Sequence, residues 1–276
     1  MLILADGHVH VHRCFERQAF FDAAFANLLH GSVQLGLRGP TLGCLFLTEV
    51  QGDDFFQEAR RSVGRITWGP WSAAVTGEEN SLWVRRDRGA TLLVVAGRQI
   101  ATAERLEVLA LGLTRTPADG RALPETLDFA ISHHALPVIP WGFGKWWGSR
   151  GRLVDGIIRS VEPGRLFLGD NGGRPRGSPR PRLFRLAEKR GVLVLPGSDP
   201  LPFAFEANKV GRYGFLVDCD LARGRPAQAV LTAVRGTKTQ PLTFGRRESL
   251  LRSCRAQLAL RLRSHRAPAR RSADPS

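Results

Sequence analysis

Three of the seven histidines of this chain fall within five residues, directly after an apolar run at the N-terminus. His8 and His10 lie two positions apart, so in a β-strand their side chains would share one face, with Cα atoms about 7 Å apart. Neutral imidazole is a common ligand for zinc, manganese and iron ions. The pattern predicts a metal site at the end of the first strand. The alternative is an exposed edge strand that carries scattered histidines.

Two carboxylates also follow apolar runs and are candidates for the same site. Glu49 comes just after a run that ends at Leu47, and Asp199 follows a sharp turn at Gly197 and Ser198. Each could bind a metal ion or accept a proton from water. Each could instead cap the following helix or turn. We expect Asp199 and Glu49 to serve as metal ligands and as candidates for the catalytic base.

A third group of residues could hold the negative charge of a substrate. Lys145 lies between glycine-rich positions and two tryptophans, where it is a candidate catalytic or anion-binding group, although the tryptophans could also form a lid. Asn171 and Arg174 belong to a Gly-rich turn whose N–H groups could bind phosphate. An ordinary flexible turn is the alternative. Gln99, after another apolar run, is a further substrate-binding candidate.

The elements that would position these residues are short apolar runs separated by segments with helical spacing. Such an alternation predicts βαβ units, a parallel sheet and right-handed crossovers. In parallel barrels the functional side chains follow the carboxyl ends of the strands. We therefore expect the candidates above to meet at one rim. The expected strands are residues 2–5, 42–47, 92–95, 107–111, 137–140, 166–168 and 192–195, and the expected helices 15–29, 54–63, 124–133, 153–161 and 181–190.

The rest of the chain departs from this alternation. Residues 66–88 contain three tryptophans and a polar turn, which predicts a β-hairpin insertion whose tip could cover the barrel mouth. A further strand is expected over 210–217 and a further helix over 226–234. We predict one domain over residues 1–245, a basic amphipathic helix over 246–263 and a disordered tail over 264–276.

Charge and cysteine content narrow the class of protein. The formal net charge is +15, and nine arginines with only two acidic residues lie from residue 246 onward. Only four of the 40 basic residues are lysines. This excess of arginine indicates the codon bias of a GC-rich bacterial genome more than a surface that binds nucleic acid. We therefore do not favour nucleic acid as a partner. Four widely spaced cysteines suggest reduced thiols. We expect a cytoplasmic chain with no signal sequence or membrane span. The sequence does not indicate an oligomeric state.

Two motifs resemble those of the polymerase and histidinol phosphatase (PHP) family. Asp6-Gly7-His8-Val9-His10 is similar to the first motif of that family, and Gly197-Ser198-Asp199 to the start of its last motif. The resemblance extends loosely from residue 1 to about residue 218. It implies an α/β fold, a distorted seven-stranded (β/α) barrel of TIM-barrel-like type, that binds up to three metal ions.

Other positions differ from the motifs of that family where it has metal ligands. His8, His10 and Asp199 carry over, and Glu49 is a conservative change from the Asp of the family. The resemblance therefore implies one or two divalent ions, Zn, Mn, Fe or Mg, more than three. At the remaining positions where the family has metal ligands, this chain has other residues, namely Val50, Gln99, Pro140 with Trp141, and Leu201.

These observations predict a metal-dependent hydrolase, a phosphoesterase that uses a metal-activated water on a small phosphorylated substrate. Asp199 or Glu49 would accept the proton of that water, while Lys145 and Arg174 would bind the substrate's negative charge. One alternative is a catalytically degenerate PHP-like domain that binds a small anion or a protein partner. A second alternative is a nucleic-acid-processing factor.

Overall fold

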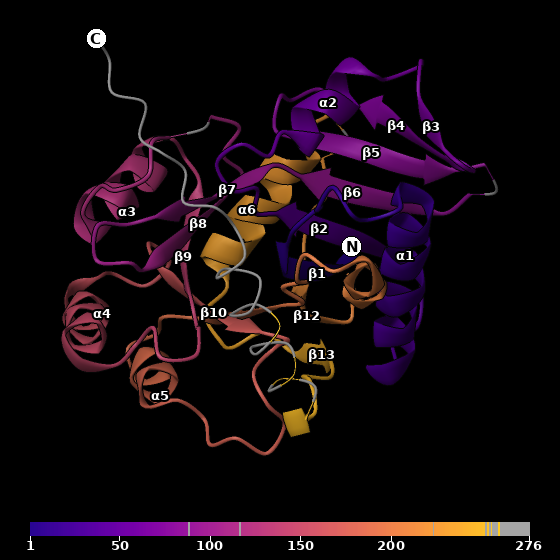
Figure 1. Ribbon diagram of the computed structural model, residues 1–276. Coiled ribbons are helices and arrows are strands. Elements are labelled where there is room, and N and C mark those ends of the chain that lie inside the picture. The colour runs from indigo at the N-terminus through magenta and orange to yellow at the C-terminus, as the bar shows by residue number, and fades with distance from the viewer. Residues whose placement is uncertain are drawn as a thin grey trace, which may run out of the picture.

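The computed structural model describes residues 1–251, apart from Arg88, Thr116 and Arg223, together with Ser253, Arg255 and Ala259. Within these residues the chain forms a mixed α/β structure with one sheet of eight strands and one of five (Figure 1). Part of the predicted helix over 246–263 and all of the predicted tail over 264–276 lie outside the described residues.

The larger sheet has the order β13-β12-β1-β2-β6-β5-β4-β3. Its centre is parallel, because β1 pairs with β2 and β2 with β6 in the same direction, whereas every strand added outside these three pairs antiparallel. The strands are β1 (Leu2–Val9), β2 (Thr41–Leu47), β3 (Thr67–Trp68), β4 (Trp71–Val75), β5 (Ser81–Arg86), β6 (Thr91–Val95), β12 (Tyr213–Asp218) and β13 (Thr243–Gly245).

The smaller sheet has the order β11-β10-β9-β8-β7. Strands β9, β10 and β11 are parallel, and β8 and β7 follow them antiparallel. The strands are β7 (Gly97–Ala101), β8 (Glu107–Leu111), β9 (Leu136–Pro140), β10 (Phe167–Asn171) and β11 (Val194–Gly197).

Helices cover the outer faces of both sheets, and one helix packs between them (Figure 1). Side chains of α1 and α2 form one core with the larger sheet, and those of α3, α4 and α5 form another with the smaller sheet. A third core joins the inner faces of both sheets to α6. The helices are α1 (Arg17–Gln34), α2 (Phe55–Arg61), α3 (Leu123–Ser132), α4 (Gly148–Ser160), α5 (Arg182–Lys189) and α6 (Pro226–Gly236), with the 3-10 helix η1 (Ala204–Lys209).

This architecture corrects the predicted seven-stranded (β/α) barrel, which was wrong. In the described part of the chain the strands make two separate sheets and do not close into a barrel. Antiparallel strands extend both sheets beyond their parallel centres, and α6 occupies the space between the inner faces. The stretch 66–88 forms the antiparallel strands β3, β4 and β5, which widen the edge of the larger sheet beside β6.

The two sheets nevertheless approach each other where their parallel strands end. The backbone N–H of Asp199, just after β11, donates to the carbonyl of His8 in β1 at 2.9 Å. On the other side, Glu49 and Arg98 form an isolated parallel bridge between the end of β2 and β7. Polar side chains from both sheets are thereby brought to one edge of the molecule. None of the helices in the described residues has the length and apolar character needed to cross a lipid bilayer.

Candidate metal centre

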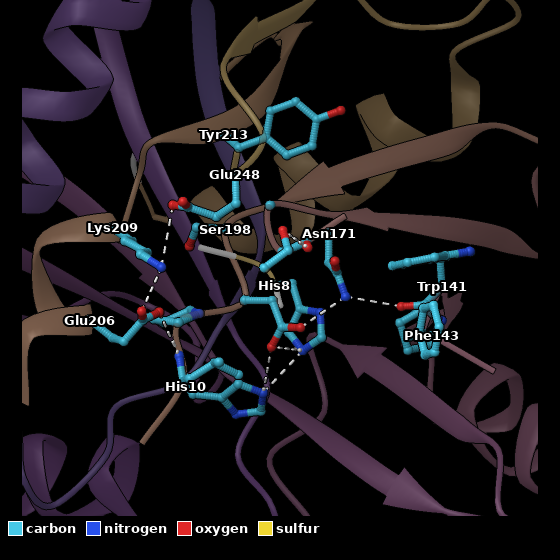
Figure 2. Close-up of a pocket in the computed structure, with 18 of the residues that line it drawn as sticks. His8, His10, Trp141, Phe143, Asn171, Ser198, Glu206, Lys209, Tyr213 and Glu248 are labelled. Carbon is cyan, nitrogen blue, oxygen red and sulfur yellow. Dashed lines mark hydrogen bonds and ion pairs between the residues drawn. The ribbon is translucent and has the colours of Figure 1, made fainter. Parts of the chain in front are cut away.

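His8, His10 and Asp199 meet where β1 and β11 end, at the edge of the two sheets (Figure 2). The two imidazole Nε2 atoms lie 3.0 Å apart. Oδ1 of Asp199 lies 3.5 Å from Nε2 of His8 and 3.6 Å from Nε2 of His10. All three ligand atoms fall within 4.8 Å of one another. This geometry makes the three side chains a group that could hold a metal ion.

The position of His8 is fixed by a buried carboxylate two residues earlier in β1. Asp6 accepts hydrogen bonds from the backbone N–H groups of His8, Ser198 and Gly211, at 3.2, 2.8 and 2.8 Å. Burial raises the pKa of Asp6 to about 6, although these bonds oppose the shift. Asp6 thus ties the histidine strand to the turn that carries Asp199, and its role is structural.

Asp199 is held in place by backbone and side-chain contacts. Its φ angle is +49°, in the left-handed region, which turns the chain sharply after β11. The side-chain amide of Asn171 donates to Oδ2 of Asp199 at 3.0 Å and to the carbonyl of Trp141 at 3.0 Å. With Oδ2 occupied in this way, Oδ1 faces the two histidines.

Gly197 allows this close approach of the two strands. A Cβ atom at position 197 would lie 2.4 Å from both the Cβ and the backbone nitrogen of His8. Any other residue would therefore push the Asp199 turn away from the histidines. Glycine is required here because the two backbones touch.

The pKa values of His10 and Asp199 are shifted in the directions that favour binding of a cation. Burial, together with the nearby His8, lowers the pKa of His10 to about 3, so its imidazole is neutral and has a lone pair to donate. Burial opposes the ionisation of Asp199, but its electrostatic interactions with His8, His10 and Lys145 lower the pKa of its carboxyl below the usual value. Two imidazoles and one carboxylate form a donor set used by catalytic zinc and non-haem iron.

One feature of the cluster differs from well-supported metal sites. Histidine ligands usually donate their second ring N–H to a carboxylate, a carbonyl or water. Nδ1 of His10 is buried and has no hydrogen-bond partner in the described part of the structure. The residues fit a divalent ion by their donor chemistry, but Nδ1 of His10 lacks the hydrogen bond that usually orients such a ligand.

A cavity of about 730 Å³ opens beside the cluster. Oε1 of Gln99 reaches within 3.2 Å of Nε2 of His8 and lines the cavity, as does Asn171. Lys145 also lines it and forms an ion pair with Glu107. The predicted candidates Gln99, Lys145 and Asn171 therefore share one cavity with the cluster. So do the replaced ligand positions, namely Val50, Pro140, Trp141 and Leu201.

The structure does not bring Glu49 to the cluster. Oε1 of Glu49 accepts a hydrogen bond of 2.7 Å from the backbone N–H of Phe56 in the first turn of α2, and Oε2 pairs with Arg98 at 3.0 Å. Burial raises the pKa of Glu49 to about 7, against the opposing effects of Phe56 and Arg98. Glu49 therefore has the helix-capping role that was the alternative to metal binding, because its carboxylate already accepts a hydrogen bond at the start of α2.

Arg174 also lies apart from the cluster. Asn171 and Asp170 are neighbours in β10, so strand alternation sends their side chains to opposite faces. Arg174 forms two 2.7 Å hydrogen bonds with the buried carboxylate of Asp170, which also accepts one of 3.0 Å from the hydroxyl of Tyr213. Its guanidinium is therefore engaged in an ion pair on the face away from Asp199.

The opposite wall of the cavity carries a charged network that the sequence analysis missed (Figure 2). Lys209 lies 2.5 Å from Glu206 and 3.3 Å from Glu248, and Arg212 lies 3.1 Å from Glu248. The i,i+3 spacing of Glu206 and Lys209 was the one local signal of this network. Glu248 comes from a segment distant in sequence. His12, two residues after His10, also lines the cavity.

The fold and the site together define a mixed α/β protein with a His-His-Asp group that could bind a metal ion. No protein-family model matches the chain, and no curated protein sequence matches it. Its fold is similar to that of PsfC from Pseudomonas syringae PB-5123, with a TM-score of 0.53 and 15% identity over 96% of this chain and 98% of PsfC.

A second solved structure with a similar fold is the novel lesion-specific endonuclease PfuEndoQ from Pyrococcus furiosus. The TM-score is 0.54 at 11% identity, and the match covers 89% of this chain and 59% of PfuEndoQ. This chain thus spans about three fifths of the length of the endonuclease. At these identities the two comparisons establish a likeness of fold.

Proposed function

We propose that this protein is a metal-dependent hydrolase that acts on a phosphoester. The observation that carries the proposal is the convergence of His8, His10 and Asp199 on one side of a cavity of about 730 Å³. A similar fold in a lesion-specific endonuclease supports the reaction class, because endonucleases cleave phosphodiester bonds.

In this proposal, the two imidazoles and Oδ1 of Asp199 would hold a zinc, manganese or iron ion. A divalent ion bound there would polarise a phosphoryl oxygen and lower the pKa of a water ligand from about 15.7 toward 7. Asn171 would keep Asp199 aimed at the histidines through its 3.0 Å bond to Oδ2. Of the two carboxylates expected to accept a proton, Asp199 is the one beside the cavity.

The negative charge of the substrate would be bound by Lys145. Its side chain lines the cavity and is one-third exposed, and Glu107 fixes the ammonium group by an ion pair. An ammonium held next to a reacting phosphoryl group stabilises the charge that develops in the transition state. Lys209 and Arg212 on the far wall could bind a second part of the substrate, although Glu206 and Glu248 neutralise them in part.

The test combines metal analysis with a rate measurement. The purified protein is incubated with Zn²⁺ or Mn²⁺, freed of excess ion, and analysed by mass spectrometry of its metal content. Hydrolysis of p-nitrophenyl phosphate and bis(p-nitrophenyl) phosphate is then followed. We expect bound metal in the wild type, and a loss of about 100-fold or more in both metal affinity and rate in His10→Ala, because a ligand is removed.

The matched control is His30→Ala, which removes an exposed histidine of α1 far along the chain from the cluster. It should leave metal content and rate unchanged. A wild-type protein that retains no metal, or a His10→Ala variant that hydrolyses the esters at the wild-type rate, would contradict the proposal.

A second candidate function is a degenerate domain that binds a small anion without turnover. It is favoured by the apolar side chains Val50, Pro140, Trp141 and Leu201, which line the cavity where the family resemblance places metal ligands. This candidate predicts metal binding in the wild type with no hydrolysis of either ester. Isothermal titration with inorganic phosphate would then detect binding that His10→Ala weakens.

A further inference from the structure

A second pocket, here named the arginine pocket, adjoins the cavity of the metal cluster. It has a volume of about 410 Å³ and lies between β10, β11, β12 and β13. Two residues, Tyr213 and Arg246, line both pockets, so the two spaces are neighbours. The charged residues that line the arginine pocket are Asp170, Arg174, Arg176, Arg180, Arg246 and Arg247.

The charges of this pocket are not balanced. Asp170 neutralises Arg174 at the buried floor, and Arg180 forms an ion pair with Glu188. Arg176, Arg246 and Arg247 have no carboxylate within ion-pair distance anywhere in the described part of the chain. Three positive charges around one small pocket repel one another and create a strongly positive potential.

The backbone holds these arginines together against that repulsion. Nε of Arg176 donates to the carbonyl of Arg247 at 2.6 Å, and the backbone N–H of Arg176 donates to the carbonyl of Glu248 at 2.7 Å. Arg247 in turn donates to the carbonyl of Pro175 at 3.4 Å. Two segments about 70 residues apart in the sequence are thus joined so that their guanidinium groups line one space.

The floor of the pocket is rigid and presents a further guanidinium. Arg174 is 3% exposed, and its two bonds to Asp170 fix the plane of the group. The hydroxyl of Tyr213 supports Asp170 from the other side. A ligand in the pocket would therefore meet a fixed floor and a rim of three arginines that have no carboxylate partner among the described residues.

We propose that the arginine pocket binds an oxyanion of the phosphate class, either inorganic phosphate or a phosphate group of a larger molecule. Guanidinium groups bind phosphate oxygens in pairs, and a tetrahedral dianion offers oxygens to several arginines at once. A planar monoanionic carboxylate would satisfy fewer of them. The pocket is a site separate from the metal cluster, and the proposal does not depend on the proposed hydrolase activity.

The test is isothermal titration of the full-length, EDTA-treated protein at low ionic strength. Three probes are used: inorganic phosphate, pyrophosphate and glycerol 3-phosphate. We expect saturable binding of one anion per chain, with affinity at least tenfold lower in Arg176→Gln/Arg247→Gln because two uncompensated charges are lost. Tightest binding of inorganic phosphate would identify the free ion as the ligand. Tighter binding of either other probe would identify a phosphate group of a larger molecule.

The matched control is Arg65→Gln/Arg152→Gln, which removes two exposed arginines outside the pocket and changes the net charge equally. It should retain wild-type phosphate affinity, which excludes a general charge effect. The titration uses EDTA-treated protein, so failure of the metal proposal would leave this result intact. No saturable binding to the wild type, or equal affinities in the pocket and control variants, would overturn the proposal.

Discussion

Two buried polar groups lie where the strands of the larger sheet end, and they differ in how their polar atoms are satisfied. In the Glu49–Arg98 pair both carboxylate oxygens are engaged, and Arg98 also donates to the carbonyl of Asp53 at 2.8 Å. In the His8–His10–Asp199 cluster the two Nε2 atoms face each other and Nδ1 of His10 has no partner in the described residues.

The difference separates a structural site from one that suits a ligand. Buried polar groups in proteins are normally hydrogen-bonded, and a group that is not satisfied within the chain costs free energy of folding. The Glu49–Arg98 pair is complete and holds the start of α2. The histidine cluster is incomplete without a cation, and it borders a cavity. The following predictions test whether one group serves stability and the other serves binding.

The largest expected effect on stability is that of Arg98→Ala. The change leaves the carboxylate of Glu49, which is 3% exposed, without its ion-pair partner. Removing one member of a buried pair costs about 3 to 5 kcal/mol of unfolding free energy. Urea denaturation followed by circular dichroism measures it. The double variant Glu49→Met/Arg98→Met should recover much of the loss, and equal losses in both variants would argue against pairing as the cause.

A smaller effect should follow from the raised pKa of Glu49. Its carboxyl is protonated more readily in the folded protein, where the pKa is about 7, than in the unfolded chain, where it is near 4.5. The stability that this group contributes is therefore fully present below pH 4.5 and is lost as the pH rises through 7. The loss amounts to roughly 3 kcal/mol.

Glu49→Gln checks this prediction because the amide resembles the protonated carboxyl. The unfolding free energy of wild type relative to Glu49→Gln should fall between pH 5 and pH 8. Urea titrations at four or five pH values across that range would measure the difference. A constant difference over the range would show that Glu49 stays ionised in the folded protein.

The next effect concerns metal affinity and not folding. Asn171 binds Oδ2 of Asp199, so Asn171→Ala frees the carboxylate to rotate away from the histidines. Loss of a group that orients a metal ligand typically lowers affinity by about 10- to 100-fold. Competition with a zinc chelator measures it. Asn27→Ala, which removes an amide bonded to the carbonyls of Asn208 and Val210, is the control and should bind zinc normally.

The sequence was sufficient for most elements of the fold, although not for β7, β13 or η1, and it was insufficient for their assembly. Each of the seven apolar runs overlaps a strand, because buried strands are continuous apolar segments. The expected helices overlap α1 to α5 for a similar reason, their regular apolar spacing. Closure into a barrel was wrong, since it depends on pairings between distant segments. β8 reads as a buried strand like the others, yet it pairs antiparallel with both neighbours.

The same limit applies to the site. His8, His10 and Asp199 could be found because each lies at the end of a strand or within two residues of it, and the structure brings them together. Glu49 and Arg174 carry equally suggestive side chains, but their partners Arg98 and Asp170 are set by sheet pairing and strand alternation. Lys209 and Glu248 come from segments outside the parallel strands, where no periodic pattern indicates which side chains will meet.

The smallest expected effect on folding is that of His10→Leu in metal-free protein. Leucine fills a similar volume and removes the unpartnered Nδ1, so the unfolding free energy should stay within about 1 kcal/mol of wild type or rise. Adding Zn²⁺ should stabilise only the wild type, by about 2.7 kcal/mol when free zinc is 100 times its dissociation constant. Urea titration with and without zinc measures both quantities. If His10→Leu instead destabilised the metal-free protein by several kcal/mol, as expected for Arg98→Ala, the cluster would be a structural element, and the contrast between the two polar groups would fail.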